Sequence, residues 1–428
     1  MQEGSSSVLR QIEGSKAVAE TVARCRPEVV CAYPISPQTH IIEAVGAMVR
    51  SGELAPCEFI NVESEFAAMS VAIGASATGA RAYTATSSQG LLFMMEAVYN
   101  AAGLGLPIVM TLANRAIGAP INIWNDHSDA MAARDAGWVQ LFAETNQEAA
   151  DLHVLAFRLA EELSVPVMVC MDGFILTHAV EAVDVPSQDE VDRYLPPFEP
   201  RQVLDPAAPV SIGAMVGPDA FEEVRVLAYL RQLDVLARIP ELAAEFARAF
   251  GRPSGGLVST YRTDDADLVI VALGSVLGTI KDAADARRDA GERVGVVGIT
   301  SFRPFPSDAV RDALARARTV VVVEKAFSIG FGGVVSTDVA MATRDTGNSL
   351  HTVVAGLGGR PITQRALEQV ISDAGGGRLG RLSFLDLDER VVERERARMM
   401  LDRRSGPTAE NVLRDLGTIR VEPRGASR

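Results

Sequence analysis

The chain has 428 residues, 48% of them hydrophobic and 22% charged, which is typical of a globular protein with about two or three domains. Its net charge of -14 argues against broad contact with a phosphate backbone, so nucleic acid is not expected as a partner. The three lysines, Lys16, Lys281 and Lys325, lie outside any G-x-x-x-x-G-K-[ST] loop, which argues against a P-loop nucleotide enzyme.

The cysteines and the amino terminus predict a cytoplasmic protein. Cys25, Cys31, Cys57 and Cys170 form no C-x-x-C pair, so we expect four buried free thiols and no metal or iron–sulfur ligands in this chain. Residues 1–15 lack the basic and apolar regions of a signal peptide. No apolar run approaches the ~18 residues that a membrane span needs.

The first ~180 residues alternate buried strands with helices, which predicts a doubly wound parallel sheet. The expected strands are EVVCAYPI (28–35), EFINVE (58–63), RAYTAT (81–86), LPIVMTLANR (106–115) and VPVMVCMDGF (165–174). The expected helices are HIIEAVGAMVR (40–50), SEFAAMSVAIGASATG (64–79) and GLLFMMEAVYNAAG (90–103).

Residues from about 180 to 260 have a different composition. Two stretches rich in proline and acidic residues, 183–200 and 204–213, precede a long helical pattern over 221–250. We interpret this part as a connecting segment whose helices pack on their neighbours.

A second α/β region begins near Asp264. Its expected strands are DLVIVALGS (267–275), VGVVGIT (294–300), TVVVVEKA (319–326) and LHTVVAGLG (350–358), with a helix over 279–291. SFRPFPSD (301–308) and SIGFGG (328–333) are expected to be turns, since they are rich in glycine and proline. A charged helix is predicted from about Asp386 onward.

Polar residues follow the predicted strands of the first region, where an open α/β sheet collects its ligands. The candidate segments are YPISP (33–37), ESE (63–65), TSSQG (86–90), NR (114–115) and NIWNDHSD (122–129). Together they would place a carboxylate, hydroxyls and an arginine at one sheet edge, as a site for a small anionic molecule requires.

Each of these segments also has a purely structural interpretation. The prolines of 33–37 can fix a rigid turn, and Ser87 and Ser88 can cap the following helix. A glutamate is favoured at a helix start by the helix dipole, and Arg115 could pair with an acid at the surface. The loop over 122–129 could be a folded surface loop.

Long ordered segments carry a resemblance to a known family. Residues 33–39, 62–103, 106–120, 121–140 and 165–178 resemble the alpha subunit of pyruvate:ferredoxin oxidoreductases and related 2-oxoacid oxidoreductases. So do LVIVALGSVLGTIKDA, SFRPFP and VVVVEKAFSIGFGG in the second region. The resemblance runs from about residue 10 to about residue 390.

This resemblance implies two doubly wound α/β domains. Residues 1–190 would form the pyrimidine-binding domain of a thiamine diphosphate site, and 191–262 the connecting helical segment. Residues 263–385 would form a domain like the carboxyl-terminal one of transketolases, and 386–428 a charged tail.

It also implies a cofactor site shared between subunits. A beta subunit would hold the diphosphate and its Mg²⁺, and a gamma subunit and a ferredoxin-like delta subunit would supply the rest, including the iron–sulfur clusters. In agreement, the sequence has no GDG motif with a downstream asparagine pair and no ferredoxin-like cysteine run.

The family's functional residues fall on identifiable positions. Glu65 would hydrogen-bond N1′ of the aminopyrimidine, with Glu63 as its rival. Arg115 would bind the substrate carboxylate, and Ser36, where the family usually has threonine, would contact the substrate. The remaining cofactor-binding positions are Tyr33, Pro34, Ser88 and Gln89.

The expected reaction is the oxidative decarboxylation of a 2-oxoacid to an acyl-coenzyme A, with electrons passed to ferredoxin or another acceptor. Pyruvate is the family's usual substrate, but loss of the threonine methyl at Ser36 leaves room for a bulkier branched or aromatic oxoacid such as phenylglyoxylate. Two alternatives stay open: half of a non-oxidative thiamine diphosphate enzyme, and a non-catalytic scaffold subunit.

Overall fold

A computed structural model describes residues 9–401 and 406–418. The prediction that residues 1–15 contain no signal peptide and the prediction of a charged tail over 386–428 therefore lie partly outside the described residues. The contacts divide the chain into one compact unit that ends at Ser383 and a second that begins at Phe384.

The amino-terminal region is built on a seven-stranded sheet in the order β12-β6-β7-β5-β4-β2-β3. Its strands are β2 (Val29–Ala32), β3 (Glu58–Asn61), β4 (Ala82–Thr86), β5 (Ile108–Asn114), β6 (Val139–Phe142), β7 (Val167–Asp172) and β12 (Ser301–Arg303). The pairings among β2 to β7 are parallel. Strands β4 to β7 are buried along their whole length. This agrees with the continuous apolar sequences predicted as strands for β4, β5 and β7, whereas β6 was not predicted.

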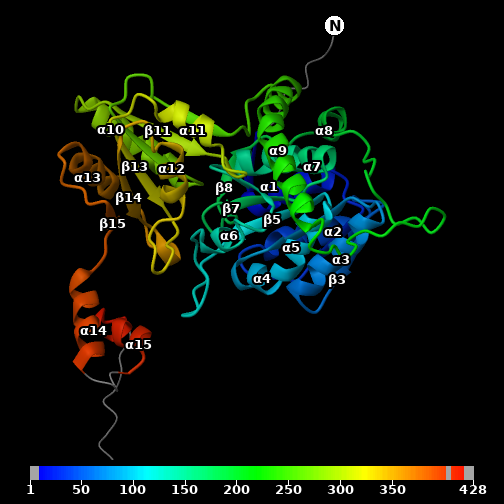
Figure 1. Ribbon diagram of the computed structural model, residues 1–428, viewed down its shortest axis with the longest axis horizontal. Helices are drawn as coiled ribbons and strands as arrows, with labels where there is room; N and C mark the ends of the chain where they lie inside the picture. Colours follow the sequence, from blue (N-terminus) through cyan, green and yellow to red (C-terminus); the bar gives the residue numbers. More distant parts are fainter. Residues whose placement is uncertain (1–8, 402–405, 419–428) are drawn as a thin grey trace, which may run out of the picture. The chain divides into compact units, whose positions relative to one another are not determined.

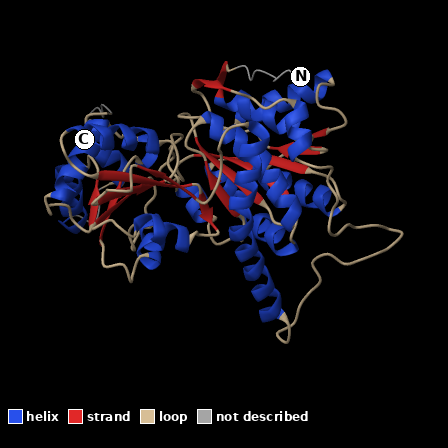
Figure 2. Ribbon diagram, turned by 90° about the horizontal axis from the view of Figure 1, so that it is seen from above, coloured by secondary structure: helices blue, strands red, loops and turns tan. Residues whose placement is uncertain are grey.

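Helices cover both faces of this sheet (Figures 1 and 2). They are α1 (Gly14–Arg24), α2 (Thr39–Ser51), α3 (Glu65–Ala77), α4 (Ser88–Phe93), α5 (Met95–Leu104), α6 (Ser128–Ala132) and α7 (Asn146–Leu163). Alternate side chains of β5 divide between two cores. Met110 and Leu112 pack with residues of α3 and α5, and Val109 packs with residues of α1, α2 and α7.

Several elements of this region differ from the predicted ones. Strand β6 and helices α1, α6 and α7 were not predicted. The helix expected over 90–103 is interrupted at Met94, so it forms α4 and α5. A small antiparallel sheet of β1 (Arg10–Glu13) and β8 (Val180–Val183) was not predicted. Its four-residue strands are too short to show a clear period in the sequence.

The second α/β region has a six-stranded sheet in the order β15-β14-β13-β10-β11-β9. Its strands are β9 (Val258–Tyr261), β10 (Leu268–Ala272), β11 (Val294–Ile299), β13 (Thr319–Glu324), β14 (Ser349–Val354) and β15 (Leu382–Phe384). Its helices are α10 (Val276–Asp289), α11 (Ser307–Leu314), α12 (Val335–Ala342), the short 3-10 helix η1 (Leu357–Gly359) and α13 (Gln364–Gly375). The pairings among β10, β11, β13 and β14 are parallel, so the predicted α/β fold with two largely parallel sheets is confirmed.

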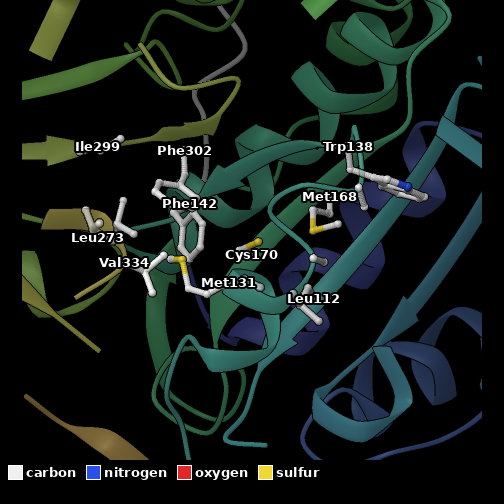
Figure 3. Packing of buried hydrophobic residues seen from close by; sticks show 14 of the residues in the cluster. Leu112, Met131, Trp138, Phe142, Met168, Cys170, Leu273, Ile299, Phe302 and Val334 are labelled. Carbon is white, nitrogen blue, oxygen red and sulfur yellow. The ribbon is translucent and has the colours of Figure 1, made fainter. Parts of the chain in front are cut away.

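The prediction of a plain turn over 301–308 is wrong, because its first three residues form β12. This strand leaves the second region and pairs antiparallel with β6 at the edge of the first sheet. The residue that follows it, Pro304, has no N–H to extend the ladder. β12 also inserts Phe302 beside Phe142 of β6, with ring centroids 6.0 Å apart. Figure 3 shows these two rings at the centre of a core to which both regions contribute.

The intervening residues contain α8 (Gln188–Tyr194) and the 30-residue helix α9 (Phe221–Phe250). The carboxyl-terminal half of α9 packs on α7. Its buried residues recur at helical spacing: Val235, Ile239, Leu242, Phe246 and Phe250. The domain limits at residues 190, 262 and 385 stay predictions.

The second unit contains α14 (Glu389–Leu401) and α15 (Thr408–Asp415). These two helices pack on each other through an ion pair between Arg394 and Asp415. In the ranges 9–401 and 406–418, no helix combines the length and apolar character needed to cross a membrane.

Candidate functional site

The predicted site residues lie where the parallel strands of the first sheet end. β2 leads into the segment 33–37, β4 into 87–90 and β5 into Arg115. Because parallel strands end at the same edge of a sheet, one edge carries all of these turns.

Glu65 is the first residue of α3, and Ser64 caps this helix by accepting a hydrogen bond from the Ala67 N–H at 3.2 Å. The side chain of Glu65 is buried, with 7% of its surface exposed, whereas its rival Glu63 is exposed. The helix start therefore separates the two carboxylates, and only that of Glu65 turns into the protein.

The Glu65 carboxylate lies against Gly90, in the turn that follows β4. A Cβ at position 90 would lie 2.8 Å from Glu65 Oε1 and 2.5 Å from Thr86 Oγ1, so only glycine permits these close contacts. Within the described part of the chain, the Glu65 carboxylate has no hydrogen-bond partner, and the buried Thr86 hydroxyl has none either. Buried polar atoms are normally paired, so this site has unused capacity for a ligand.

The hydroxyls of Ser87 and Ser88 do not cap α4. Ser87 Oγ donates to the carbonyl of Ala113 at 2.7 Å, and Ser88 Oγ donates to that of Ala116. Both serines therefore tie the turn after β4 to the end of β5. Gln89 is half-buried beside Gly118, so of the two predicted cofactor-binding residues in this turn only Ser88 is fully enclosed.

Arg115 is 7% exposed and reaches the segment that carries Ser36. Its Nη1 donates to the carbonyl of Ser36 at 2.9 Å, and its Nε donates to that of Asn122 at 3.0 Å. Burial lowers the pKa of Arg115, partly opposed by the charge of Asp129. Among residues 9–401 and 406–418, no carboxylate pairs with the guanidinium, so several of its five N–H donors are unused.

The remaining predicted residues of the 33–37 segment are at the surface. Tyr33 is 39% exposed, and Pro34 and Ser36 are exposed too. The backbone carbonyl of Tyr33 accepts a hydrogen bond from Gln38. The structure thus joins Ser36 to Arg115, whereas the side chains of Tyr33 and Pro34 lie at the surface.

Asp129 joins the turns of this site, a role that the sequence did not identify. Its buried carboxylate accepts hydrogen bonds from the Ser88 and Arg115 N–H groups and from the Asn114 amide, at 2.9–3.0 Å. Burial raises the pKa of Asp129 to about 6, and these hydrogen bonds limit the rise. The only sequence signal was its place in the polar loop 122–129.

A second buried polar cluster lies between the two sheets, around Asp172 at the end of β7. Its carboxylate is 2.6 Å from His127 Nε2 and 3.0 Å from Lys325 Nζ, and it accepts hydrogen bonds from Ser275. Lys325 also donates to Asn125. Burial alone would raise the pKa of Asp172, but Lys325 and His127 hold it well below its usual range. These groups satisfy one another, so the cluster fastens the two regions together.

All four cysteines are free thiols, as predicted. Cys25, Cys31 and Cys170 are buried, whereas Cys57 is only partly buried, so the expectation of four buried thiols is wrong for Cys57. Burial raises the pKa of Cys31 to about 12 and that of Cys57 to about 11. Thiols with such pKa values are neutral at pH 7 and are poor nucleophiles and metal ligands.

Comparison with known proteins identifies related domains along the chain. Residues 20–239 match the family described as pyruvate flavodoxin/ferredoxin oxidoreductase, thiamine diphosphate-binding. Residues 266–367 match the pyruvate:ferredoxin oxidoreductase core domain II.

Curated relatives match over most of their length. The pyruvate synthase subunit PorA of Methanosarcina barkeri is 46% identical over 390 residues, covering 89% of this chain and 97% of the relative. The ketoisovalerate oxidoreductase subunit VorA of Pyrococcus horikoshii is 38% identical over 369 residues, covering 86% and 93%.

Two solved structures share the fold. The 2-oxoglutarate:ferredoxin oxidoreductase of Magnetococcus marinus, with 2-oxoglutarate, coenzyme A and succinyl-CoA bound, has a TM-score of 0.68 at 19% identity; the match covers 86% of this chain and 65% of that one. A split-gene transketolase, an inactive beta4 tetramer, has a TM-score of 0.51 at 16% identity and coverages of 85% and 98%. The chain therefore belongs to the thiamine diphosphate-binding pyruvate:ferredoxin oxidoreductase family, as its motifs predicted.

Proposed function

We propose that this chain is the alpha subunit of a multisubunit 2-oxoacid oxidoreductase that converts a 2-oxoacid and coenzyme A into an acyl-coenzyme A and CO2. Pyruvate is the first substrate to test, because relatives 41–46% identical are pyruvate synthase subunits. Electrons would pass through iron–sulfur clusters on partner subunits to ferredoxin or another acceptor.

The observation that carries this proposal is the Glu65 carboxylate, which belongs to a buried side chain, packs closely against Gly90 and has no hydrogen-bond partner among the described residues. Such a carboxylate suits the N1′ atom of an aminopyrimidine, with which it can share a proton. The buried Thr86 hydroxyl offers a further polar atom beside it. These residues fit the pyrimidine half of thiamine diphosphate, and the bound cofactor would supply the carbanion chemistry that decarboxylation needs.

The residues of this chain would also bind and orient the substrate. Arg115 has donors to spare and lies beside Ser36, so it suits a carboxylate that approaches along the exposed 33–37 segment. Asp129 holds the backbone N–H groups of Ser88 and Arg115 together. It would therefore fix the distance between the cofactor turn and the substrate-binding arginine.

The proposed site is incomplete in this chain alone. The sequence has no GDG signature for a metal–diphosphate site, and its four cysteines are scattered, so we assign the Mg²⁺–diphosphate half to a beta subunit. The iron–sulfur clusters would lie on a ferredoxin-like delta subunit, beside a gamma subunit. The free thiols support placing this complex in the reducing cytoplasm.

A substrate panel on the complex that copurifies with this chain tests the proposal. The assay follows coenzyme A-dependent reduction of a viologen dye with pyruvate, 2-oxoglutarate, 2-oxoisovalerate and phenylglyoxylate. We expect reduction with one preferred acid. A thiamine diphosphate-containing complex without iron–sulfur subunits would instead favour the non-oxidative alternative, and a complex without cofactor or iron would favour the scaffold alternative.

A branched 2-oxoacid is the second candidate substrate. The relative named ketoisovalerate oxidoreductase subunit supports it, and so does the smaller side chain of Ser36. Preference for 2-oxoisovalerate in the panel would establish it over pyruvate.

A further inference from the structure

Two histidines and a glutamate from distant segments of the chain lie close together. Glu13 ends β1, His40 lies in the first turn of α2, and His178 lies between β7 and β8. One potential ligand atom of each residue lies within 4.8 Å of the others. Residues 13, 40 and 178 form no local sequence motif, and the expectation that this chain has no metal ligands rested on the spacing of its cysteines alone.

The contacts inside this cluster hold the three groups together. His40 Nδ1 is 2.6 Å from Glu13 Oε1, and the rings of His40 and His178 lie 4.6 Å apart. Thr177 Oγ1 is 2.7 Å from His178 Nδ1, which fixes the His178 ring and leaves its Nε2 for another partner. Metal-binding histidines commonly have such a hydrogen bond on the second ring nitrogen.

Burial and charge also suit a cation. The side chain of His40 is 50% exposed and that of Glu13 is 32% exposed, so an ion could enter from solvent and keep a water ligand. Glu13 offers a carboxylate oxygen and His178 an imidazole nitrogen as possible ligand atoms. A neutral imidazole is the form that binds metals.

We propose that Glu13, His40 and His178 form a binding site for a divalent transition-metal ion of the zinc class. Two imidazoles and one carboxylate are a common ligand set for such an ion, with an open position for water. An ion would take the place of the direct contact between His40 Nδ1 and Glu13 Oε1. Mg²⁺ would not compete well, since it prefers an all-oxygen octahedral shell.

The site would brace one wall of the proposed substrate site. α2 starts directly after the 33–37 segment, and Gly173, near His178, lies so close to Pro37 that a Cβ on it would be 2.5 Å from Pro37 Cγ. A metal ion would join β1, α2 and the β7–β8 turn at this wall. Its binding should therefore raise the melting temperature of the folded chain.

The test is a zinc titration of the full chain after dialysis against EDTA, by calorimetry and by thermal unfolding. We expect one equivalent of Zn²⁺ with a dissociation constant of about 1 μM or below, a raised Tm, and no such effect of Mg²⁺. His40→Ala and His178→Ala should each weaken binding by at least about tenfold. Removing only a group that hydrogen-bonds to a metal ligand typically lowers metal affinity by about 10–100-fold, so removing a direct ligand should lower it by at least as much.

Two matched variants control for other zinc ligands. His351→Ala removes a histidine of the second sheet, and Cys57→Ser removes the most accessible thiol; both should bind zinc as the wild type does. The proposal is overturned if the wild-type chain binds no zinc at about 100 μM, if either cluster variant binds as tightly as the wild type, or if Cys57→Ser abolishes binding.

Discussion

The two α/β regions carry comparable features at the carboxyl ends of their strands, but with opposite outcomes. In the first region, Glu65 lies under Gly90 and has no hydrogen-bond partner among the described residues. In the second, Glu324 lies under Gly333 and accepts the N–H groups of residues 334 and 335 at 2.7 and 2.8 Å. The Glu65 carboxylate can therefore still accept hydrogen bonds from a ligand, whereas the Glu324 carboxylate already accepts them from the backbone at the start of α12.

The cations of the two regions differ in the same way. The Arg115 guanidinium bonds only to backbone carbonyls and retains free donors, whereas the Lys325 ammonium bonds to the Asp172 carboxylate and the Asn125 amide oxygen. A shared architecture therefore does not decide where chemistry occurs. The unpaired hydrogen-bonding capacity supports the proposed site in the first region, because a buried group without a protein partner is costly unless something else binds it.

The largest expected effect comes from removing the Glu65 charge. Glu65→Gln should lower kcat of the assembled complex by about 10²–10⁴-fold, since the amide cannot share a proton with the cofactor ring as a carboxylate does. The measurement is steady-state 2-oxoacid oxidation, with circular dichroism to verify folding. Glu63→Gln is the matched control, because this exposed neighbour should leave kcat unchanged. Equal losses in both variants would contradict the assignment of Glu65.

Substitution of Asp172 should strongly lower the free energy of unfolding, because this residue lies in the buried cluster between the two sheets and not in the proposed catalytic site. Asp172→Asn should destabilise the chain by about 3–5 kcal/mol in urea unfolding, because it leaves Lys325 buried without its counter-charge. Asp345→Asn at the exposed Arg344 pair should change the unfolding free energy by about 0–1 kcal/mol. If the Asp172 variant is as stable as the wild type, the buried cluster does not fasten the two regions.

The pH dependence of stability follows from the same carboxylate. The folded-state pKa of Asp172 is held well below its ordinary value of 3.8. Its stabilisation is therefore complete above about pH 4 and is lost as the pH falls through the lower folded-state value. The difference in unfolding free energy between wild type and Asp172→Asn should shrink in acid, and a constant difference down to pH 2 would contradict this linkage.

The sequence predicted those parts of the site that depend on strand order alone. Arg115 and Ser36 meet because β5 and β2 end at the same edge, and Glu65 is distinguished from Glu63 by the start of α3. Contacts between side chains far apart in the chain were not predictable. Asp129 and its hydrogen-bond partner Ser88 are 41 residues apart in the sequence, and Lys325 and Asp172 are 153 residues apart. Strand β12 was missed because three residues show no period and its partner β6 lies far away in sequence.

A smaller effect, specific to substrate binding, is expected at Arg115. Arg115→Ala should raise KM for the 2-oxoacid by about 10–100-fold, the equivalent of one charged hydrogen bond. The KM of Arg115→Lys should lie between those of the wild type and Arg115→Ala, because lysine keeps the charge but lacks the planar pair of donors. An unchanged KM in Arg115→Ala would show that the carboxylate binds elsewhere.

The last prediction concerns the close contact between Gly90 and Glu65, and it compares a glycine at the proposed cofactor site with a glycine elsewhere in α3. Gly90→Ala places a methyl group against Glu65 Oε1 and Thr86 Oγ1, so thiamine diphosphate affinity of the complex should fall by about 1–3 kcal/mol. Gly74→Ala, in α3 with open space around its Cβ, should leave that affinity unchanged and slightly stabilise the helix. Cofactor titration of both complexes measures the difference. If Gly90→Ala binds the cofactor as tightly as Gly74→Ala does, the pyrimidine does not bind beside Gly90 and Glu65, and the contrast with the hydrogen-bonded Glu324 loses its functional meaning.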